Sequence, residues 1–191
     1  WGQIIMFDRF SKKLLNPITG FIIVAIIALS YIYIDKPLVT VLSTLNLQEN
    51  FPVLVWVTYF GSSRVYLILF FVFALFFRYG YVNSRWEQRA WFLWLCVAFS
   101  SLICGLLKAS LGRARPDLWL HSQEYGFFWL KLDRPHMSFP SGHTTTMMSI
   151  AFGLSALFPR YWILFLSAGL LVALSRILLL QHYLSDVFAA M

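Results

Sequence analysis

Three short polar clusters interrupt an otherwise apolar sequence, and each holds residue types that handle phosphate groups. The clusters are KASLGRARP (108–116), PSGH (140–143) and SRILLLQHYLSD (175–186). Lys108, Arg115 and Arg176 are cations, and an arginine fork matches phosphate oxygens while a lysine supplies a point charge. Three cations in so apolar a chain would be costly without an anion to neutralise them. The clusters therefore predict an anion site that a tetrahedral phosphate would fill.

The second cluster predicts the start of a helix. Free backbone N–H groups and the helix dipole at such a start favour an anion, and Gly142 would let that anion approach the backbone closely. Pro140, Ser141 and Gly142 taken alone are more typical of an ordinary helix cap. Only their combination with the other two clusters favours a phosphate cradle that includes Ser141 and Gly142.

Two histidines add groups that titrate near neutral pH. Asp186 follows His182 by four residues, so on a helix the two would share a face. A carboxylate there would fix the imidazole tautomer and leave the other ring nitrogen free to attack. His143 then suits the general acid that protonates the leaving alcohol. No metal-ligand set stands out and no cofactor is expected, because the three cations supply the electrostatic stabilisation that a metal ion would give.

The elements that position these residues are expected to be membrane helices. The chain has 191 residues, a mean hydropathy of +0.72 and only 12% charged residues, which is too apolar for an ordinary soluble domain. The expected fold is all-α, a polytopic membrane helix bundle forming one domain over 1–191. We expect six transmembrane helices, with the sixth beginning near Val187 and truncated, and both termini incomplete because Trp1 is not an initiator residue. The long uncharged runs are Ile18–Ile34, Val65–Phe77, Ala90–Leu107, Thr144–Phe158 and Tyr161–Ser175.

The distribution of basic residues predicts the orientation of these helices. Alternating spans place three basic groups on one side, which the positive-inside rule makes cytoplasmic. These groups are Arg9, Lys12 and Lys13, then Arg78, Arg85 and Arg89, then Arg160. The three polar clusters then share the opposite, extracytoplasmic face, as in a multi-pass protein of a bacterial inner membrane. We explain the net charge of +7 by basic residues that orient the helices in the membrane and by others that bind an anionic substrate. The expected partners are therefore a lipid bilayer and a phosphorylated lipid, with no nucleic acid.

The three clusters together resemble the signature of the type 2 phosphatidic acid phosphatase (PAP2) family. They have the forms Lys-x6-Arg-Pro, Pro-Ser-Gly-His and Ser-Arg-x5-His-x3-Asp, in that order. The resemblance implies a covalent phosphohistidine on His182 supported by Asp186, with His143 as the acid and no metal ion. It also implies that the phosphate cradle consists of Lys108, Arg115, Ser141, Gly142 and Arg176.

The expected function is that of an integral membrane lipid phosphatase. It would hydrolyse a lipid phosphomonoester or remove the terminal phosphate of a lipid diphosphate. A lipid phosphotransferase that uses the same intermediate is one alternative. An anion transporter or channel is another, although it would not explain a His-x3-Asp pair beside a second histidine. Arg113 is a possible contact for the substrate headgroup, with a solvated loop charge as its alternative. His121 and His136 are expected to be non-catalytic.

Overall fold

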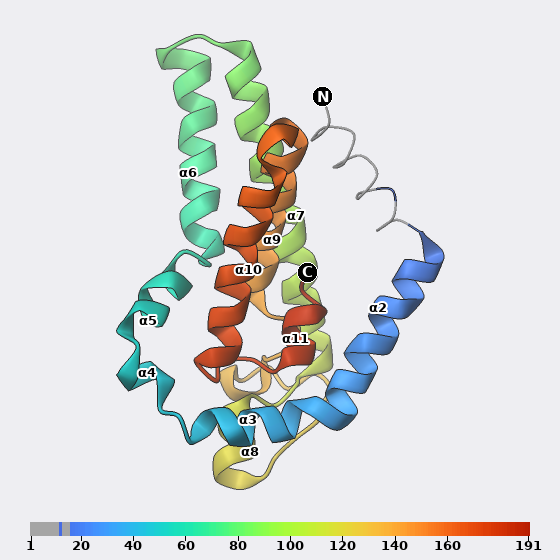
Figure 1. Cartoon of the computed structure of the whole chain (residues 1–191). Helices are drawn as coiled ribbons and strands as arrows, with labels where there is room; N and C mark the ends of the chain where they lie inside the picture. Colours follow the sequence, from blue (N-terminus) through green and yellow to red (C-terminus); the bar gives the residue numbers. More distant parts are fainter. Residues whose placement is uncertain (1–11, 13–15) are drawn as a thin grey trace.

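The computed structural model describes residue 12 and residues 16–191, and its regular elements in that part of the chain are helices (Figure 1). Arg9 and Lys13, which entered the orientation argument, lie outside the described residues. The elements are α2 (Pro17–Leu29), η1 (Ser30–Ile34), α3 (Asp35–Ser43), α4 (Leu47–Asn50), α5 (Pro52–Tyr59), α6 (Ser63–Leu75), η2 (Phe76–Gly80), α7 (Ser84–Leu111), α8 (Pro116–Ser122), η3 (Arg134–His136), α9 (Gly142–Leu157), η4 (Pro159–Tyr161), α10 (Trp162–Leu178) and α11 (Leu184–Phe188).

Within the described residues, four helical segments are long and apolar enough to cross a membrane: Pro17–Ser43, Ser63–Gly80, Ser84–Leu111 and Pro159–Leu178. The all-helical prediction is therefore confirmed, whereas five complete spans were expected. The fourth expected span corresponds to α9, which has 16 residues and so is only about 24 Å long. That length falls short of the roughly 30 Å hydrocarbon core of a bilayer. The sixth expected helix corresponds to α11, which starts earlier than Val187.

The first span continues well beyond Ile34, where the uncharged run ends. The π-helical turn η1 joins α2 to α3 without a break, so the helix runs from Pro17 to Ser43. Asp35 directly follows the uncharged run Ile18–Ile34. It lies inside this helix with no exposed surface, because its carboxylate has buried partners described below. The remaining connection to α6 contains α4 and α5.

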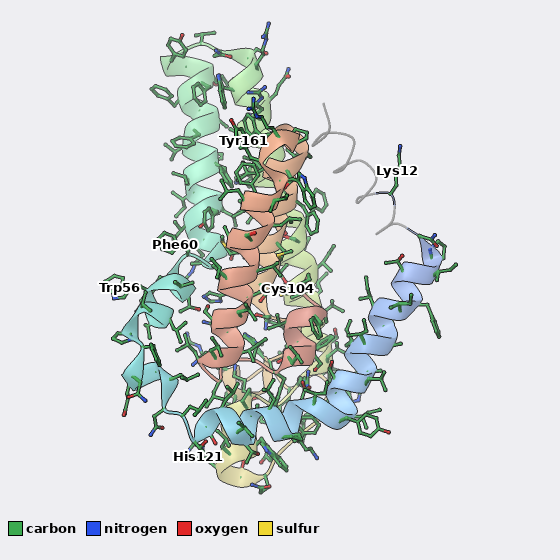
Figure 2. All side chains as sticks on the ribbon, viewed as in Figure 1. Lys12, Trp56, Phe60, Cys104, His121 and Tyr161 are labelled. Atoms are coloured by element: carbon green, nitrogen blue, oxygen red, sulfur yellow. The ribbon has the colours of Figure 1, made fainter. Side chains whose placement is uncertain are left out.

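The centre of the molecule is a bundle in which α9 packs against both α7 and α10, and α6 packs along α7 (Figure 1). Phe70, Val97 and Ile150 form part of one buried cluster between these helices. Figure 2 shows many carbon-rich side chains on the outward flanks of the helices. Large apolar side chains are exposed there, and Phe21 is 76% exposed. Apolar surface on this scale requires a lipid environment. The chain is a multi-pass membrane protein.

One end of the bundle gathers the carboxyl ends of α7 and α10, the start of α9 and the short helix α8 (Figure 1). Gly112 ends α7 in the left-handed conformation, with φ of +56°, and lets the chain reverse. The following loop folds back, since the N–H of Phe128 donates to the carbonyl of Gly112 at 3.0 Å. The prediction that the three polar clusters meet at one end of the helices is confirmed.

Candidate active site

The cations of the first and third clusters face a shared cavity. Lys108, Arg115, Arg176 and His143 line a space of about 500 Å³ at the end of the bundle. Nζ of Lys108 donates to the carbonyl of Met137 at 2.8 Å. Neutral oxygens also fix the two arginines: Nε of Arg115 donates to the carbonyl of Arg134 at 3.1 Å, and Nη1 of Arg176 donates to the Thr58 hydroxyl.

These bonds to neutral oxygens do not neutralise the three cations, although the carboxylate of Asp117 shares the cavity wall with them. Among the residues that the structure describes, no carboxylate forms an ion pair with Lys108, Arg115 or Arg176. Thr58 belongs to α5, and no sequence pattern predicted that this helix would contact the site. Three oriented cations around one cavity can bind a tetrahedral anion and stabilise charge that develops on it.

The second cluster begins α9 beside this cavity, as predicted, and Ser141 is bonded within the protein. Its backbone N–H donates to the carbonyl of Asp186 at 3.1 Å, and its hydroxyl accepts from Thr144 at 3.0 Å. Ser141 is fully buried and its N–H is taken by this bond, so its place in the phosphate cradle stays a prediction. The N–H groups available in the first turn begin at Gly142, whose backbone lies beside Lys108.

His182 and Asp186 are close together, although not on one helix face as predicted. The chain turns at His182, and α11 begins only at Leu184. Nδ1 of His182 lies 3.5 Å from Oδ2 of Asp186, and that oxygen also accepts from Ser138 Oγ at 2.6 Å and from the Tyr183 N–H at 3.0 Å. Ser138 was not predicted as a site residue. With Nδ1 turned to the carboxylate, Nε2 is the nitrogen left for attack.

Burial sets the charge states of this pair in the resting protein. It lowers the pKa of His182 to about 3, with the bond to Asp186 opposing the shift. Burial alone would raise the pKa of Asp186, but the guanidinium of Arg113 and hydrogen bonds from His182 and Ser138 lower it to about 2. The imidazole is therefore neutral and the carboxylate ionised near pH 7, as a histidine nucleophile requires.

His143 is held in place by a close contact with Gly61. A Cβ added to Gly61 would lie 2.5 Å from Cδ2 of His143, so only a glycine fits there. The imidazole lines the cation cavity and also a neighbouring one of about 400 Å³ that reaches Thr58 and Arg176. This position, at the edge of the cation cluster, suits a group that exchanges protons with a leaving group.

Arg113 does not occupy the position expected of a headgroup contact. Its side chain has no exposed surface and forms ion pairs with Asp35 and Asp186. A fully buried guanidinium cannot reach a headgroup, so both that hypothesis and the solvated-loop alternative are wrong. Asp35 was missed as a partner. The signal that could have found it is a carboxylate within an apolar run, which in a membrane protein points to a functional role.

Neither loop histidine joins the cation cluster. Nδ1 of His136 lies 2.9 Å from both carboxylate oxygens of Asp133, and its ring is 4% exposed. Nδ1 of His121 is 3.1 Å from Oδ1 of Asp117 at the surface. Their predicted non-catalytic status remains a prediction.

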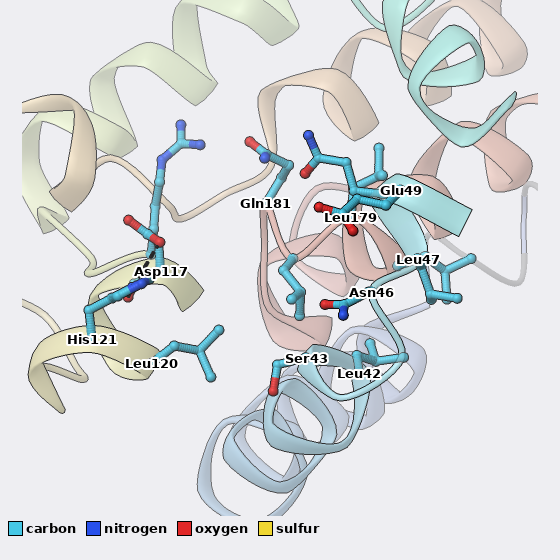
Figure 3. A pocket seen from close by; sticks show the side chains of 14 residues that line it. Leu42, Ser43, Asn46, Leu47, Glu49, Asp117, Leu120, His121, Leu179 and Gln181 are labelled. Carbon is cyan, nitrogen blue, oxygen red and sulfur yellow. Dashed lines mark hydrogen bonds and ion pairs between the residues drawn. The ribbon is translucent and has the colours of Figure 1, made fainter. Parts of the chain in front are cut away.

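A larger polar pocket adjoins the cation cavity, and Arg115 and Asp117 line both. Its volume is about 820 Å³. Figure 3 shows Asp117 and His121 on one side of it and Asn46, Glu49 and Gln181 on the other. Amide and carboxylate side chains share its wall with six leucines, a mixture that suits an amphiphilic ligand with several hydrogen-bonding groups.

The site combines three cations that form no ion pair with a described carboxylate, the half-buried His143 and the buried His182–Asp186 pair. This combination is suited to phosphate chemistry. The sequence profile of the PAP2 superfamily matches residues 89–191, more than half of the chain. The chain belongs to the PAP2 superfamily.

Two curated relatives match a stretch of 103 residues each. A lipid A 1-phosphatase of Rhizobium johnstonii is 39% identical over 103 residues, which is 52% of this chain and 41% of the relative. A lipid A 1-phosphatase of Rhizobium etli is also 39% identical over 103 residues, or 52% of this chain and 43% of the relative. The chain thus spans less than half the length of these two relatives. A transmembrane PAP2 type phosphatidylglycerolphosphate phosphatase from Bacillus subtilis is 18% identical, with a TM-score of 0.44 over 99% of this chain and 87% of that one.

Proposed function

We propose that the protein is a lipid phosphatase that works through a phosphohistidine on His182. The observation that carries this proposal is the shared cavity of Lys108, Arg115, Arg176 and His143, with the His182–Asp186 pair bound to the start of α9 beside it. The cations would bind the phosphate oxygens and stabilise the charge that builds up on them in the transition state. Family membership supports the same chemistry.

In the proposed first step, the lone pair on Nε2 of His182 attacks phosphorus and the bond from phosphorus to the lipid oxygen breaks. Burial and the three nearby cations lower the pKa of His143 to about 4, and a bound phosphate would offset these cations and favour the protonated ring. Protonated His143 then gives its proton to the departing oxygen, so the lipid leaves as an alcohol or as a shorter phosphate. Asp186 stabilises the positive charge that forms on the imidazole. In the second step His143 takes a proton from water, the water oxygen attacks phosphorus, and the N–P bond breaks to restore His182.

We propose a substrate with a bulky polar headgroup, of the kind found in glycolipids such as lipid A. The polar pocket of about 820 Å³ supports this choice, because Arg115 and Asp117 line both it and the phosphate cavity. A phosphate on Arg115 would place the adjoining headgroup among Asn46, Glu49 and Gln181. The names of the two Rhizobium relatives agree with this substrate class.

The test is phosphate release by the purified protein in mixed micelles, with excess chelator present. A lipid A 1-phosphate, phosphatidic acid, phosphatidylglycerol phosphate and undecaprenyl diphosphate form the panel. We expect turnover of the saccharide lipid to exceed that of the others, and we expect it to persist in chelator because the three cations neutralise the phosphate. Added acceptor lipids distinguish transfer from hydrolysis. Absence of phosphate release and of transfer from every lipid would reject an enzymatic function and favour an anion transporter.

A further inference from the structure

Arg113 lies between two carboxylates, those of Asp35 and Asp186, and all three side chains are fully buried. Nη2 of Arg113 is 2.6 Å from Oδ2 of Asp35, while Nη1 donates to Oδ1 of Asp186. Asp35 stands 78 residues before Arg113, within the first span. The guanidinium therefore ties the first span to the segment that carries the His–Asp pair.

Ser185 closes the connection between Asp35 and α11. Its hydroxyl accepts from Nη1 of Arg113 at 2.7 Å and donates to Oδ2 of Asp35 at 2.5 Å. Its backbone N–H donates to Oδ1 of Asp35 at 3.1 Å. Asp35 thus holds the first turn of the short helix on which Asp186 sits, so a shift of Asp35 would move the Asp186 carboxylate.

Aromatic rings surround the guanidinium of Arg113 and keep it out of contact with water. Ring centroids lie between 4.6 and 5.9 Å from its central carbon, and they belong to Tyr31, Tyr125, Phe127, Phe139 and Tyr183. In such a low-dielectric surrounding an ion pair is strong, and an unpaired charge is costly. A lysine could not replace the planar fork that spans both carboxylates.

The charges in this cluster do not cancel. One guanidinium faces two carboxylates, so a net negative charge remains next to His182. Arg113 occupies Oδ1 of Asp186, which leaves Oδ2 for Ser138, the Tyr183 N–H and Nδ1 of His182. The arrangement orients the oxygen that faces the imidazole and favours a positive charge on that ring.

We infer that Asp35 and Arg113 are positioning residues for the nucleophile. They act through Asp186: they orient its carboxylate toward His182 and supply the extra negative charge that stabilises the phosphorylated imidazole. This inference rests on the proposed function, in which His182 attacks phosphorus. It adds a residue of the first span, outside the region that the PAP2 profile matches, to the catalytic apparatus.

Asp35→Asn is the principal variant, because the amide keeps the shape of the side chain and removes the charge. Arg113→Lys is the second, and it keeps the charge while removing the fork. We expect kcat to fall about ten- to hundredfold in each, the range seen when a partner that orients a functional histidine is removed. The inhibition constant of inorganic phosphate should change less than about twofold, since neither residue lines the cation cavity.

A mutant cycle distinguishes positioning from a merely structural role. In an Asp186→Asn background, Asp35→Asn should have little further effect on kcat, because the carboxylate through which Asp35 acts on His182 is already absent. Glu87→Gln is the matched control, since it weakens the Arg78–Glu87 pair at the other end of the molecule without touching the site. An equal fall of kcat in both backgrounds, or a kcat unchanged in Asp35→Asn and Arg113→Lys, would overturn the inference.

A second measurement does not depend on turnover. In protein labelled with ¹⁵N-histidine, the His182 resonances, assigned by their loss in His182→Gln, report which ring nitrogen carries the proton. Asp35→Asn should shift them toward a mixture of tautomers, whereas Glu87→Gln should not. Unshifted resonances would count against positioning. Absence of phosphate release by the wild-type protein, together with a clear tautomer shift, would instead reject the proposed function and leave the geometric connection standing.

Discussion

Gly61 packs directly against the imidazole of His143: a Cβ at position 61 would lie 2.5 Å from Cδ2 and 2.6 Å from Cβ of that histidine. Gly61 belongs to the turn before α6, and His143 to the first turn of α9. The turn therefore fixes where the proposed general acid stands relative to the cation cavity.

Gly61→Ala should displace His143 and weaken protonation of the leaving group. We expect kcat for a lipid phosphate to fall by roughly tenfold or more, approaching the 10²–10⁴-fold that general acid catalysis supplies. Gly20→Ala is the matched control, because a Cβ there meets nothing within 4 Å. Equal kcat values for Gly61→Ala and the wild-type protein would show that the acid does not depend on this contact.

The two histidines should respond differently to an activated substrate. His143→Ala should slow turnover of a lipid phosphate by about 10²–10⁴-fold, and it should recover partly with p-nitrophenyl phosphate, whose leaving group needs little protonation. His182→Ala should show no recovery and no acid-labile phosphoenzyme in rapid-quench experiments. Recovery of His182→Ala alone would reverse the two roles.

His182 should remain neutral well below the pH at which an ordinary histidine is protonated. Burial lowers its folded-state pKa to about 3 from 6.5, so the ring should carry no charge at pH 5. The sign for stability follows: the unfolded chain binds a proton below about pH 6.5 that the folded chain refuses, so acidification toward pH 3 should destabilise the fold. The His182 ¹⁵N resonances between pH 4 and 8 test this directly, and a midpoint near 6.5 would contradict it.

The polar pocket should govern affinity for the headgroup and not the chemistry. Glu49→Ala should raise KM for a saccharide lipid phosphate roughly two- to tenfold, as expected for the loss of one hydrogen bond. KM for phosphatidic acid should stay unchanged, because its small headgroup does not fill the space. Glu87→Ala, the same truncation at a carboxylate far from the site, serves as the control. An equal rise of KM for both lipids would place the headgroup elsewhere.

We predict that the active site faces the extracytoplasmic side. In a background with Cys96 and Cys104 replaced by alanine, Ser122→Cys should react with an impermeant thiol reagent on intact cells. Val82→Cys, at the far end of the bundle, should react only after the membrane is opened. The reverse pattern would place the site in the cytoplasm and remove outer-leaflet lipids from the possible substrates.

The sequence was sufficient to predict that residues from all three clusters meet at one end of the bundle. Lys108, Arg115, His143 and Arg176 reach one cavity because each is at a helix end or next to one, and alternating helices bring those ends together. The number of spans was less predictable. An apolar run beginning with Thr144 does not reveal that its helix, α9, is too short to cross a bilayer alone.

The residues that support the site were not predictable from local patterns. Asp35 follows YIYI and is followed by a lysine and a proline, a pattern typical of a span that ends at the interface. The helix instead continues through the π-helical turn η1 and all of α3, and Asp35 is buried within it. Ser138 and Gly61 belong to no recognisable spacing, since their partners are 48 and 82 positions away along the chain (Asp186 and His143). Their roles depend on tertiary contacts alone.

The hydrogen bond from Arg176 to Thr58 joins a signature residue to a segment outside the PAP2 match at 89–191. A chimera that grafts residues 89–191 onto the amino-terminal part of another family member would keep every signature residue and lose this contact unless position 58 kept its register. Residues 89–191 therefore do not contain every contact that holds the signature residues in place. Over evolution, positions in the amino-terminal helices should therefore vary together with positions in the signature. The sequence of these helices is then constrained by the active site as well as by the membrane.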